Sequence, residues 1–235
     1  MKLKNQVAIV TGGGRGIGRA ICKSLALDGC NIVTFSRTKN EIKSIEKEIR
    51  DLGVEAYGFK ADVRSKKDVG KVVKSCIDQF GKIDILINNA GICVFKSILE
   101  ISDEKWNEIV DTNLKGVIIC TRAVLPCMIK HGYGRIINIS SLAGQRGVWH
   151  LAVYCATKFG VRGFTQSLAK EIEDLNIKTY AVCPGACATS MYFSMIPDAD
   201  PKTLLKPEDV AKVVHSLCLP DVKTPSGADV NVEKA

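Results

Sequence analysis

The sequence predicts an α/β protein built on one parallel sheet of about seven strands with helices on both faces. Short apolar segments alternate with longer amphipathic segments along the 235 residues, which indicates alternating strands and helices. Most strand segments are apolar nearly throughout, as expected where helices cover both sides of a parallel sheet. With right-handed crossovers, such a chain forms a single domain over residues 1–235 with a doubly wound, Rossmann-type sheet. Ligands of such sheets bind beyond the carboxyl ends of the strands.

The expected strands are short and are mostly followed by Gly, Asn, Asp or Pro. They span residues 6–10, 31–35, 55–60, 83–87, 135–139, 177–183 and 228–232. The expected helices carry apolar side chains at helical spacing, and Ser65 is placed to cap one of them. They span residues 19–28, 40–52, 65–80, 103–128 and 207–219, and a further helix begins near Tyr154 and continues to about Asp174. Residues 186–206 are expected to form a loop with short helical turns.

Composition excludes several classes of protein. No run approaches the roughly 20 apolar residues of a membrane span, and the N-terminus lacks the apolar core of a signal peptide. The ten cysteines form no C-x-x-C pair, so buried free thiols are expected, with no metal site. The net charge of +8 comes from lysines interleaved with acids, which indicates solvated helix faces. We therefore expect a soluble cytoplasmic protein that binds neither nucleic acid nor membrane.

A glycine-rich stretch, residues 11–18, directly follows the first strand. Its spacing is G-x-x-x-G-x-G, and the next helix begins where it ends. A turn that needs positive φ would explain some of these glycines. Their number and place favour a loop in which a dinucleotide pyrophosphate meets the helix N-terminus.

The second strand ends in Ser36-Arg37, where an enzyme that uses NAD usually carries an acid for the ribose 2′-hydroxyl. A guanidinium suits a 2′-phosphate, and Arg15 supplies another nearby. These residues predict NADP(H) as the cofactor.

A phenol and an ammonium lie four residues apart at Tyr154 and Lys158, so both side chains share one helix face. A cation beside the phenol is expected to hold the pKa of Tyr154 below its usual value of about 10. Such a group can transfer a proton at neutral pH. Ser141 adds a hydroxyl that can hold a carbonyl oxygen, so the predicted chemistry is carbonyl reduction or its reverse.

These motifs and several others occur in a fixed order along the chain. They are Thr11-Gly-x-x-x-Gly-x-Gly18, Asn88-Asn-Ala-Gly91, Asn113, Ser141, Tyr154-x-x-x-Lys158, and Pro184-Gly185 with Thr189. Together they resemble the short-chain dehydrogenase/reductase family over essentially the whole chain. Within that family the chain is most similar to 3-oxoacyl-[acyl-carrier-protein] reductases.

The resemblance implies a role for each matching residue. Tyr154 would give the proton, Lys158 would lower the pKa of Tyr154 and hold the nicotinamide ribose, and Ser141 would orient the substrate oxygen. Asn113 would hold a water that feeds protons to Lys158. The remaining cofactor contacts would be Gly12, Arg15, Gly16, Ile17 and Gly18 at the pyrophosphate, Asp62 and Val63 at the adenine, Asn89, Ala90 and Gly91 at the ribose, and Pro184, Gly185 and Thr189 at the nicotinamide. A homo-tetramer or homo-dimer is also implied.

The substrate stays open between alternatives. Bacterial acyl-carrier-protein reductases carry basic residues where this chain has Gly132 and Leu175, and residues 186–206 form a short segment. A 3-oxoacyl thioester is the first expectation. A small ketone, sugar or pterin carbonyl is the second, and an NADP-binding regulator without activity is the third. Val94, Phe95 and Gln145 are expected to shape the pocket, whereas Trp149 and His150 either line it or only pack beside it.

Overall fold

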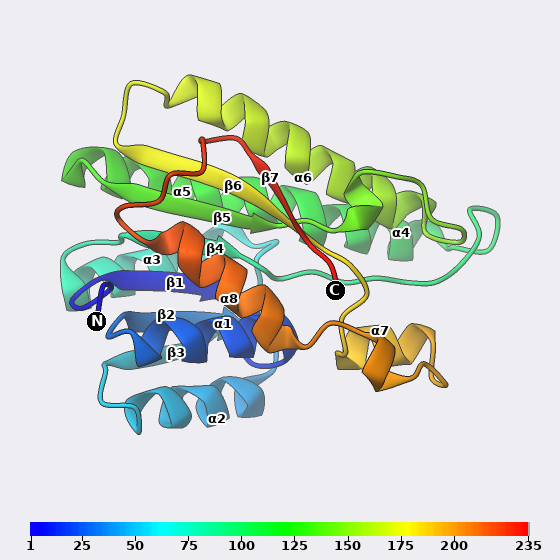
Figure 1. The fold of residues 1–235 in the computed structure, drawn as a ribbon, viewed down its shortest axis with the longest axis horizontal. Helices are drawn as coiled ribbons and strands as arrows, with labels where there is room; N and C mark the ends of the chain where they lie inside the picture. Colours follow the sequence, from blue (N-terminus) through cyan, green and yellow to red (C-terminus); the bar gives the residue numbers. More distant parts are fainter. Residues whose placement is uncertain (235) are drawn as a thin grey trace.

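The computed structural model describes residues 1–234, and they form a sheet of seven parallel strands (Figure 1). The strand order is β3-β2-β1-β4-β5-β6-β7. The strands are β1 (Val7–Thr11), β2 (Asn31–Ser36), β3 (Ala56–Lys60), β4 (Ile85–Asn88), β5 (Gly134–Ile139), β6 (Ile177–Pro184) and β7 (Asp229–Val232). The order reverses between β1 and β4, which creates the switch point where such sheets bind ligands. The predicted Rossmann-type sheet is confirmed.

Helices cover both faces of this sheet. They are α1 (Gly16–Leu27), α2 (Lys39–Arg50), α3 (Lys66–Phe80), α4 (Asp103–Val110), α5 (Gly116–His131), α6 (Ala152–Glu171), α7 (Ser190–Met195) and α8 (Pro207–Cys218). Helices α1, α2 and α8 build the core on one face, and α3, α5 and α6 build it on the other. In Figure 1, α1 and α8 pass in front of the sheet.

Strand β1 shows why the strand segments are apolar throughout. Val7 and Ile9 pack into the core beneath α3 and α5, whereas Ala8 and Val10 pack into the core beneath α1 and α8. Successive side chains of a strand point to opposite faces, so a strand between two helical layers must be apolar at every position. Burial of each larger side chain contributes roughly 1.5–3 kcal/mol.

The ends of the helices follow from capping residues. The Ser65 hydroxyl accepts a hydrogen bond from the Asp68 amide at 3.1 Å and caps α3, as predicted. At the other end of α3, Gly81 adopts φ +74°, a left-handed conformation that glycine adopts without strain. Helix α1 begins at Gly16 rather than at residue 19, because the last glycines of the loop already form its first turn.

The segment predicted as one helix over residues 103–128 is interrupted. A π-helical turn, η1 (Asp111–Lys115), separates α4 from α5, and it carries Asn113. The whole helical run, Asp103–His131, is long and apolar enough to cross a membrane by length and composition, in contrast to the expectation from the sequence. Half of its most apolar window is buried, and α5 packs against β4 and β5. This run therefore serves as a core helix of the α/β fold.

Residues 186–206 form short helical turns, as predicted: α7 and the 3-10 turn η3 (Pro201–Thr203). Helix α7 lies beyond the carboxyl ends of the strands, beside the end of α8 (Figure 1). The segment returns to the sheet through a bridge between Cys187 and Leu205. All ten cysteines are free thiols and eight of them are buried, which agrees with the expected state.

Candidate active site

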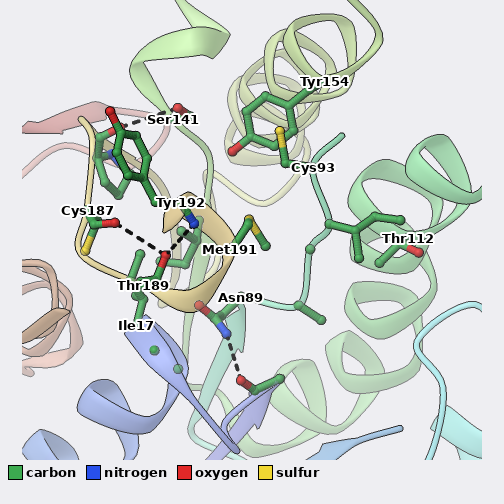
Figure 2. A pocket seen from close by; sticks show the side chains of 18 of the residues that line it. Ile17, Asn89, Cys93, Thr112, Ser141, Tyr154, Cys187, Thr189, Met191 and Tyr192 are labelled. Carbon is green, nitrogen blue, oxygen red and sulfur yellow. Dashed lines mark hydrogen bonds between the residues drawn. The ribbon is translucent and has the colours of Figure 1, made fainter. Parts of the chain in front are cut away.

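A cavity of about 480 Å³ opens beyond the carboxyl ends of the strands, at the switch point between β1 and β4. Its wall contains every residue predicted to contact the cofactor, together with Ser141. These are Gly12, Arg15, Gly16, Ile17, Gly18, Ser36, Arg37, Asp62, Val63, Asn89, Ala90, Gly91, Tyr154, Lys158, Pro184, Gly185 and Thr189. Figure 2 shows Asn89 after β4, Tyr154 on α6 and residues of the segment around α7 facing this one space. Residues far apart in sequence are thus brought together as the motifs predict.

Two positions of the glycine loop require glycine, each for a different physical reason. Gly12 adopts φ +67°, a conformation that other residues rarely accept. At Gly18 an added Cβ would lie 2.3 Å from the carbonyl oxygen of Gly12 and 2.4 Å from Nδ2 of Asn89, which leaves no room for any side chain. The missing side chains let a ligand approach the backbone of the loop and the start of α1.

The N-terminus of α1 offers unpaired amides to that ligand. Its N-cap residue Arg15 makes no side-chain cap, and the first turn contains no acid. Free amides and the positive end of the helix dipole attract an anion. The loop and the helix therefore fit a dinucleotide diphosphate.

Hydrogen bonds tie the end of β4 to the glycine loop. The Nδ2 of Asn89 donates to the carbonyl oxygens of Thr11 at 2.9 Å and Gly12 at 3.2 Å, and Figure 2 marks a bond of this side chain. The hydroxyl of Thr11 accepts from the amides of Asn89 at 3.0 Å and Ala90 at 2.9 Å. Asn89 therefore holds the glycine loop against the end of β4.

The arginines predicted for the 2′-phosphate lie on the cavity wall, and each also faces a carboxylate. Arg37 donates to Glu108 at 3.0 Å, and Arg15 lies 3.6 Å from Glu41. Asp62 is held by Arg64, whose Nη2 lies 2.6 Å from the carboxylate. Sequence reasoning missed Glu41 and Glu108, because their pairs with Arg15 and Arg37 join separate elements. It also missed Arg64, although Arg64 lies only two residues from Asp62.

Ser141, Tyr154 and Lys158 form the opposite end of the cavity. The Nζ of Lys158 donates to the carbonyl oxygen of Ile139 at 2.8 Å and lies 5.5 Å from the centre of the Tyr154 ring. The Ser141 hydroxyl accepts from the Ala143 amide at 3.1 Å. In Figure 2 the Tyr154 ring enters the cavity from α6, with the Cys93 thiol beside it.

The predicted lowering of the Tyr154 pKa is wrong for the protein without a ligand. Burial raises the pKa of Tyr154 above its ordinary value of 10.0, the Cys93 thiol acts in the same direction, and Ser141 acts against them. Burial also lowers the pKa of Lys158 from 10.5 to about 8. Removal from water disfavours the charged form of each group.

Asn113 is the one predicted site residue that does not line the cavity. It is buried, and its side chain accepts from the Ile92 amide at 2.8 Å and donates to the Ile92 carbonyl oxygen at 2.8 Å. A further bond reaches Thr157 at 3.3 Å. Asn113 therefore positions the loop after β4 against α6. Its role in supplying protons to Lys158 remains a prediction.

Of the three rings that pack together at Phe95, Trp149 and His150, only Phe95 lines the cavity. Phe95 lines it, whereas Trp149 is 75% exposed and packs against Phe95 and His150. Of the two alternatives for Trp149 and His150, lining the pocket or packing beside it, the structure shows the second. Gln145 does not line the cavity either, because its side chain donates to Asn231 at 2.6 Å.

The segment around α7 closes the cavity from the side away from the sheet. Met191, Tyr192, Met195 and Ile196 line the cavity, and the Thr189 hydroxyl caps α7 by accepting from the Tyr192 amide at 3.3 Å (Figure 2). The family resemblance implies that residues 186–206 cover the substrate, but the sequence singled out none of these four side chains, nor Cys93. Their place depends on how the segment folds back over the sheet.

Comparison with known proteins agrees with this geometry. The family model for short chain dehydrogenase matches residues 6–199. The chain is 35% identical over 237 aligned positions to the 3-oxoacyl-[acyl-carrier-protein] reductase FabG of Staphylococcus epidermidis, covering 97% of each chain. It is 40% identical over 193 positions to a putative ketoacyl reductase of Streptomyces coelicolor, covering 81% of this chain and 74% of the relative.

Solved structures show the same fold over the whole chain. An actinorhodin polyketide ketoreductase with NADPH superposes with a TM-score of 0.91 at 34% identity, covering 99% of this chain and 97% of the other. Levodione reductase superposes with a TM-score of 0.93 at 26% identity, covering 98% of this chain and 97% of the other. Family members use a nicotinamide cofactor and act on small molecules. The chain therefore belongs to the short-chain dehydrogenase/reductase family and is an oxidoreductase acting on carbonyl and hydroxyl groups.

Proposed function

We propose that the protein is an NADPH-dependent carbonyl reductase, with a 3-oxoacyl thioester as the first expected substrate. One observation carries this proposal: Ser141, Tyr154 and Lys158 face the same cavity as the glycine loop at the start of α1. A hydride donor bound along that cavity would lie between the diphosphate site and the phenol. Proton and hydride can then reach the two ends of one carbonyl bond.

In the proposed reaction, the cofactor supplies the hydride to the carbonyl carbon. The Tyr154 hydroxyl gives its proton to the carbonyl oxygen, which gives an alcohol and leaves a phenolate. Ser141 donates a hydrogen bond to the same oxygen and holds it in place. Because burial raises the pKa of Tyr154, the phenol is protonated at neutral pH and is ready to act as an acid. The Lys158 ammonium, on the same helix face, stabilises the phenolate that the transfer leaves behind.

Residues at the end of β2 support NADPH over NADH. Ser36 and Arg37 lie on the cavity wall where an acid would hold the ribose of NAD. Arg37 shares its charge with Glu108, so a bound 2′-phosphate would compete with that carboxylate. The related ketoreductase solved with NADPH supports the same choice.

The relatives support a 3-oxoacyl substrate, since three of the similar proteins are named as ketoacyl or 3-oxoacyl reductases. The apolar wall formed by Met191, Met195 and Ile196 also accepts a small ketone, which keeps that alternative open. A regulator without activity would not need the buried Lys158, whose burial is unfavourable for stability.

We also propose a homo-dimer or homo-tetramer in the cytoplasm. Exposed apolar side chains on α4, α5 and α6, namely Trp106, Ile129 and Phe159, support contact between subunits. The ten free thiols suit a reducing compartment.

The test follows the loss of NADPH absorbance with an acetoacetyl thioester, beside a panel of small ketones and sugars. Preferred turnover of the thioester supports the first expectation. Turnover of the small carbonyls alone replaces it with the second. NADPH binding without turnover of any carbonyl contradicts the proposed activity and favours the regulator.

A further inference from the structure

Arg146 lines the cavity from the loop that follows Ser141, not from the glycine loop. It follows the short turn η2 (Leu142–Gly144), which begins directly after Ser141. Among the described residues that line the cavity, the charged ones near the glycine loop and the end of β2 are Arg15, Arg37, Glu41 and Asp62, and the others are Lys158 and Arg146. The substrate half therefore carries two cations and no carboxylate.

Arg146 differs from the other arginines around the cavity. Arg15, Arg37 and Arg64 each have a carboxylate oxygen within 4.0 Å. Within residues 1–234, no Asp or Glu comes that close to Arg146, and its guanidinium donates no hydrogen bond to the protein. Arg146 is exposed and lines the cavity, so its planar group of five donors is open to solvent and to a ligand that enters the cavity.

The backbone that carries Arg146 is fixed from several sides. Its amide donates to the Leu142 carbonyl oxygen at 3.2 Å. Arg162 on α6 donates to the Gly144 carbonyl oxygen at 2.6 Å, and Gln145 donates to Asn231 next to it at 2.6 Å. Arg146 is therefore presented from an anchored loop that also bears the catalytic serine.

The surroundings of Arg146 on the cavity wall are apolar. Val148, Leu151, Met195 and Ile196 line the same cavity, and Val148 and Leu151 follow Arg146 closely in the chain. When a substrate displaces water from such a wall, the lower local dielectric strengthens an ion pair with the guanidinium. A ligand group that would complement Arg146 is an anion with oxygen acceptors.

We propose that Arg146 binds an anionic group of the substrate, so the natural substrate carries a carboxylate or a phosphate in addition to its carbonyl. This inference rests on the proposed function and deepens it. Charge-assisted bonds from a guanidinium to such oxygens form a fork with fixed geometry. Arg146 would then determine which carbonyl compounds the enzyme prefers, without acting on the reacting bond.

The test uses three probes that share one 3-oxobutyryl group. Acetoacetate carries a carboxylate, acetoacetyl-coenzyme A carries phosphates, and the thioester of N-acetylcysteamine carries neither. Rates are measured with NADPH for the unaltered protein, for Arg146→Gln and for Lys47→Gln. Lys47 is exposed on α2 and does not line the cavity, so its variant removes the same net charge elsewhere.

The expected result is a rise in KM of about tenfold or more for a charged probe in Arg146→Gln, with little change in kcat. The neutral thioester and the Lys47→Gln variant should show no such change. A rise for acetoacetate identifies a carboxylate as the ligand, and a rise for the coenzyme A thioester identifies a phosphate. The proposal would be overturned if, for each of the three probes, Arg146→Gln had the same KM as Lys47→Gln. It would also be overturned if Arg146→Gln raised the KM of the neutral thioester as much as the KM of the charged probes.

Calorimetry separates this inference from the proposed function. Acetoacetate and acetoacetyl-coenzyme A are titrated into each protein with NADP⁺ present, so binding is measured without turnover. Tighter binding to the unaltered protein than to Arg146→Gln supports the anion site even if no carbonyl is reduced. Equal binding to both proteins contradicts it.

Discussion

Replacing Lys158 with Met should change stability in opposite directions at low and high pH. The Lys158 side chain is 5% exposed, and burial lowers its pKa from 10.5 to about 8. The unfolded chain therefore binds more protons than the folded chain between these two values. As far as Lys158 is concerned, stability rises as the pH increases through this window and is lowest below pH 8.

The magnitude follows from the two pKa values. Their difference corresponds to about 3 kcal/mol of unfavourable free energy below pH 8, at about 1.4 kcal/mol per pKa unit. The Met variant removes this term, but it leaves the carbonyl oxygen of Ile139 without its donor, which costs roughly 1–3 kcal/mol. At pH 6.5 the variant should match or exceed the parent in stability, and at pH 10 it should be less stable. The difference between the two conditions should be about 2–3 kcal/mol.

Urea unfolding of the ligand-free protein, followed by circular dichroism at pH 6.5 and pH 10, measures this change. Lys170→Met is the matched control, because the Lys170 side chain is 84% exposed and its loss should have the same small effect at both pH values. If Lys158→Met were equally destabilising at pH 6.5 and pH 10, the charge on Lys158 would not oppose folding. The inference that Lys158 is a charge buried at a cost in folding free energy would then be refuted.

Two further substitutions test the cofactor half of the cavity. Gly18→Ala should destabilise the protein by about 1–3 kcal/mol and abolish NADPH binding, because the added Cβ meets backbone at 2.3 Å. Gly70→Ala, at an exposed helix position where an added Cβ meets nothing within 4 Å, should instead stabilise the protein by about 0.5–1 kcal/mol. Thermal unfolding and NADPH fluorescence compare the two variants. Equal stability and equal NADPH binding of the two variants would contradict the packing argument. Arg37→Asp should lower the ratio of kcat/KM for NADPH over NADH by about tenfold or more, since it replaces a phosphate ligand with an acid beside Glu108. An unchanged ratio would show that Arg37 does not touch the 2′-phosphate.

The elements that sequence predicted well are those set by local chemistry. Ser65 favours the N-cap of a helix, and the apolar run of β1 favours a buried strand; both appear as expected. The residues predicted to contact the cofactor line one cavity because most of them lie at or after the end of a strand, and parallel topology brings those ends to one edge of the sheet. Position along the chain was thus enough to locate the cavity.

Features that depend on packing between distant elements were not predictable. The π-helical turn at Asn113 accompanies side-chain bonds to Ile92, 21 residues away. The direction of the Tyr154 pKa depends on how far the fold excludes water, which spacing along a helix does not reveal. The pairs that Arg37 and Arg15 form with Glu108 and Glu41 likewise arise only once separate elements have met.

The central claim is that Tyr154 gives the proton in a reduction driven by NADPH. Turnover of the best carbonyl substrate and the Kd for NADPH should be measured together in the parent and in Tyr154→Phe. Loss of the general acid should lower kcat by about 10²–10⁴-fold, while the Kd for NADPH changes by no more than a few fold. Retention of most of the activity by Tyr154→Phe would contradict the mechanism.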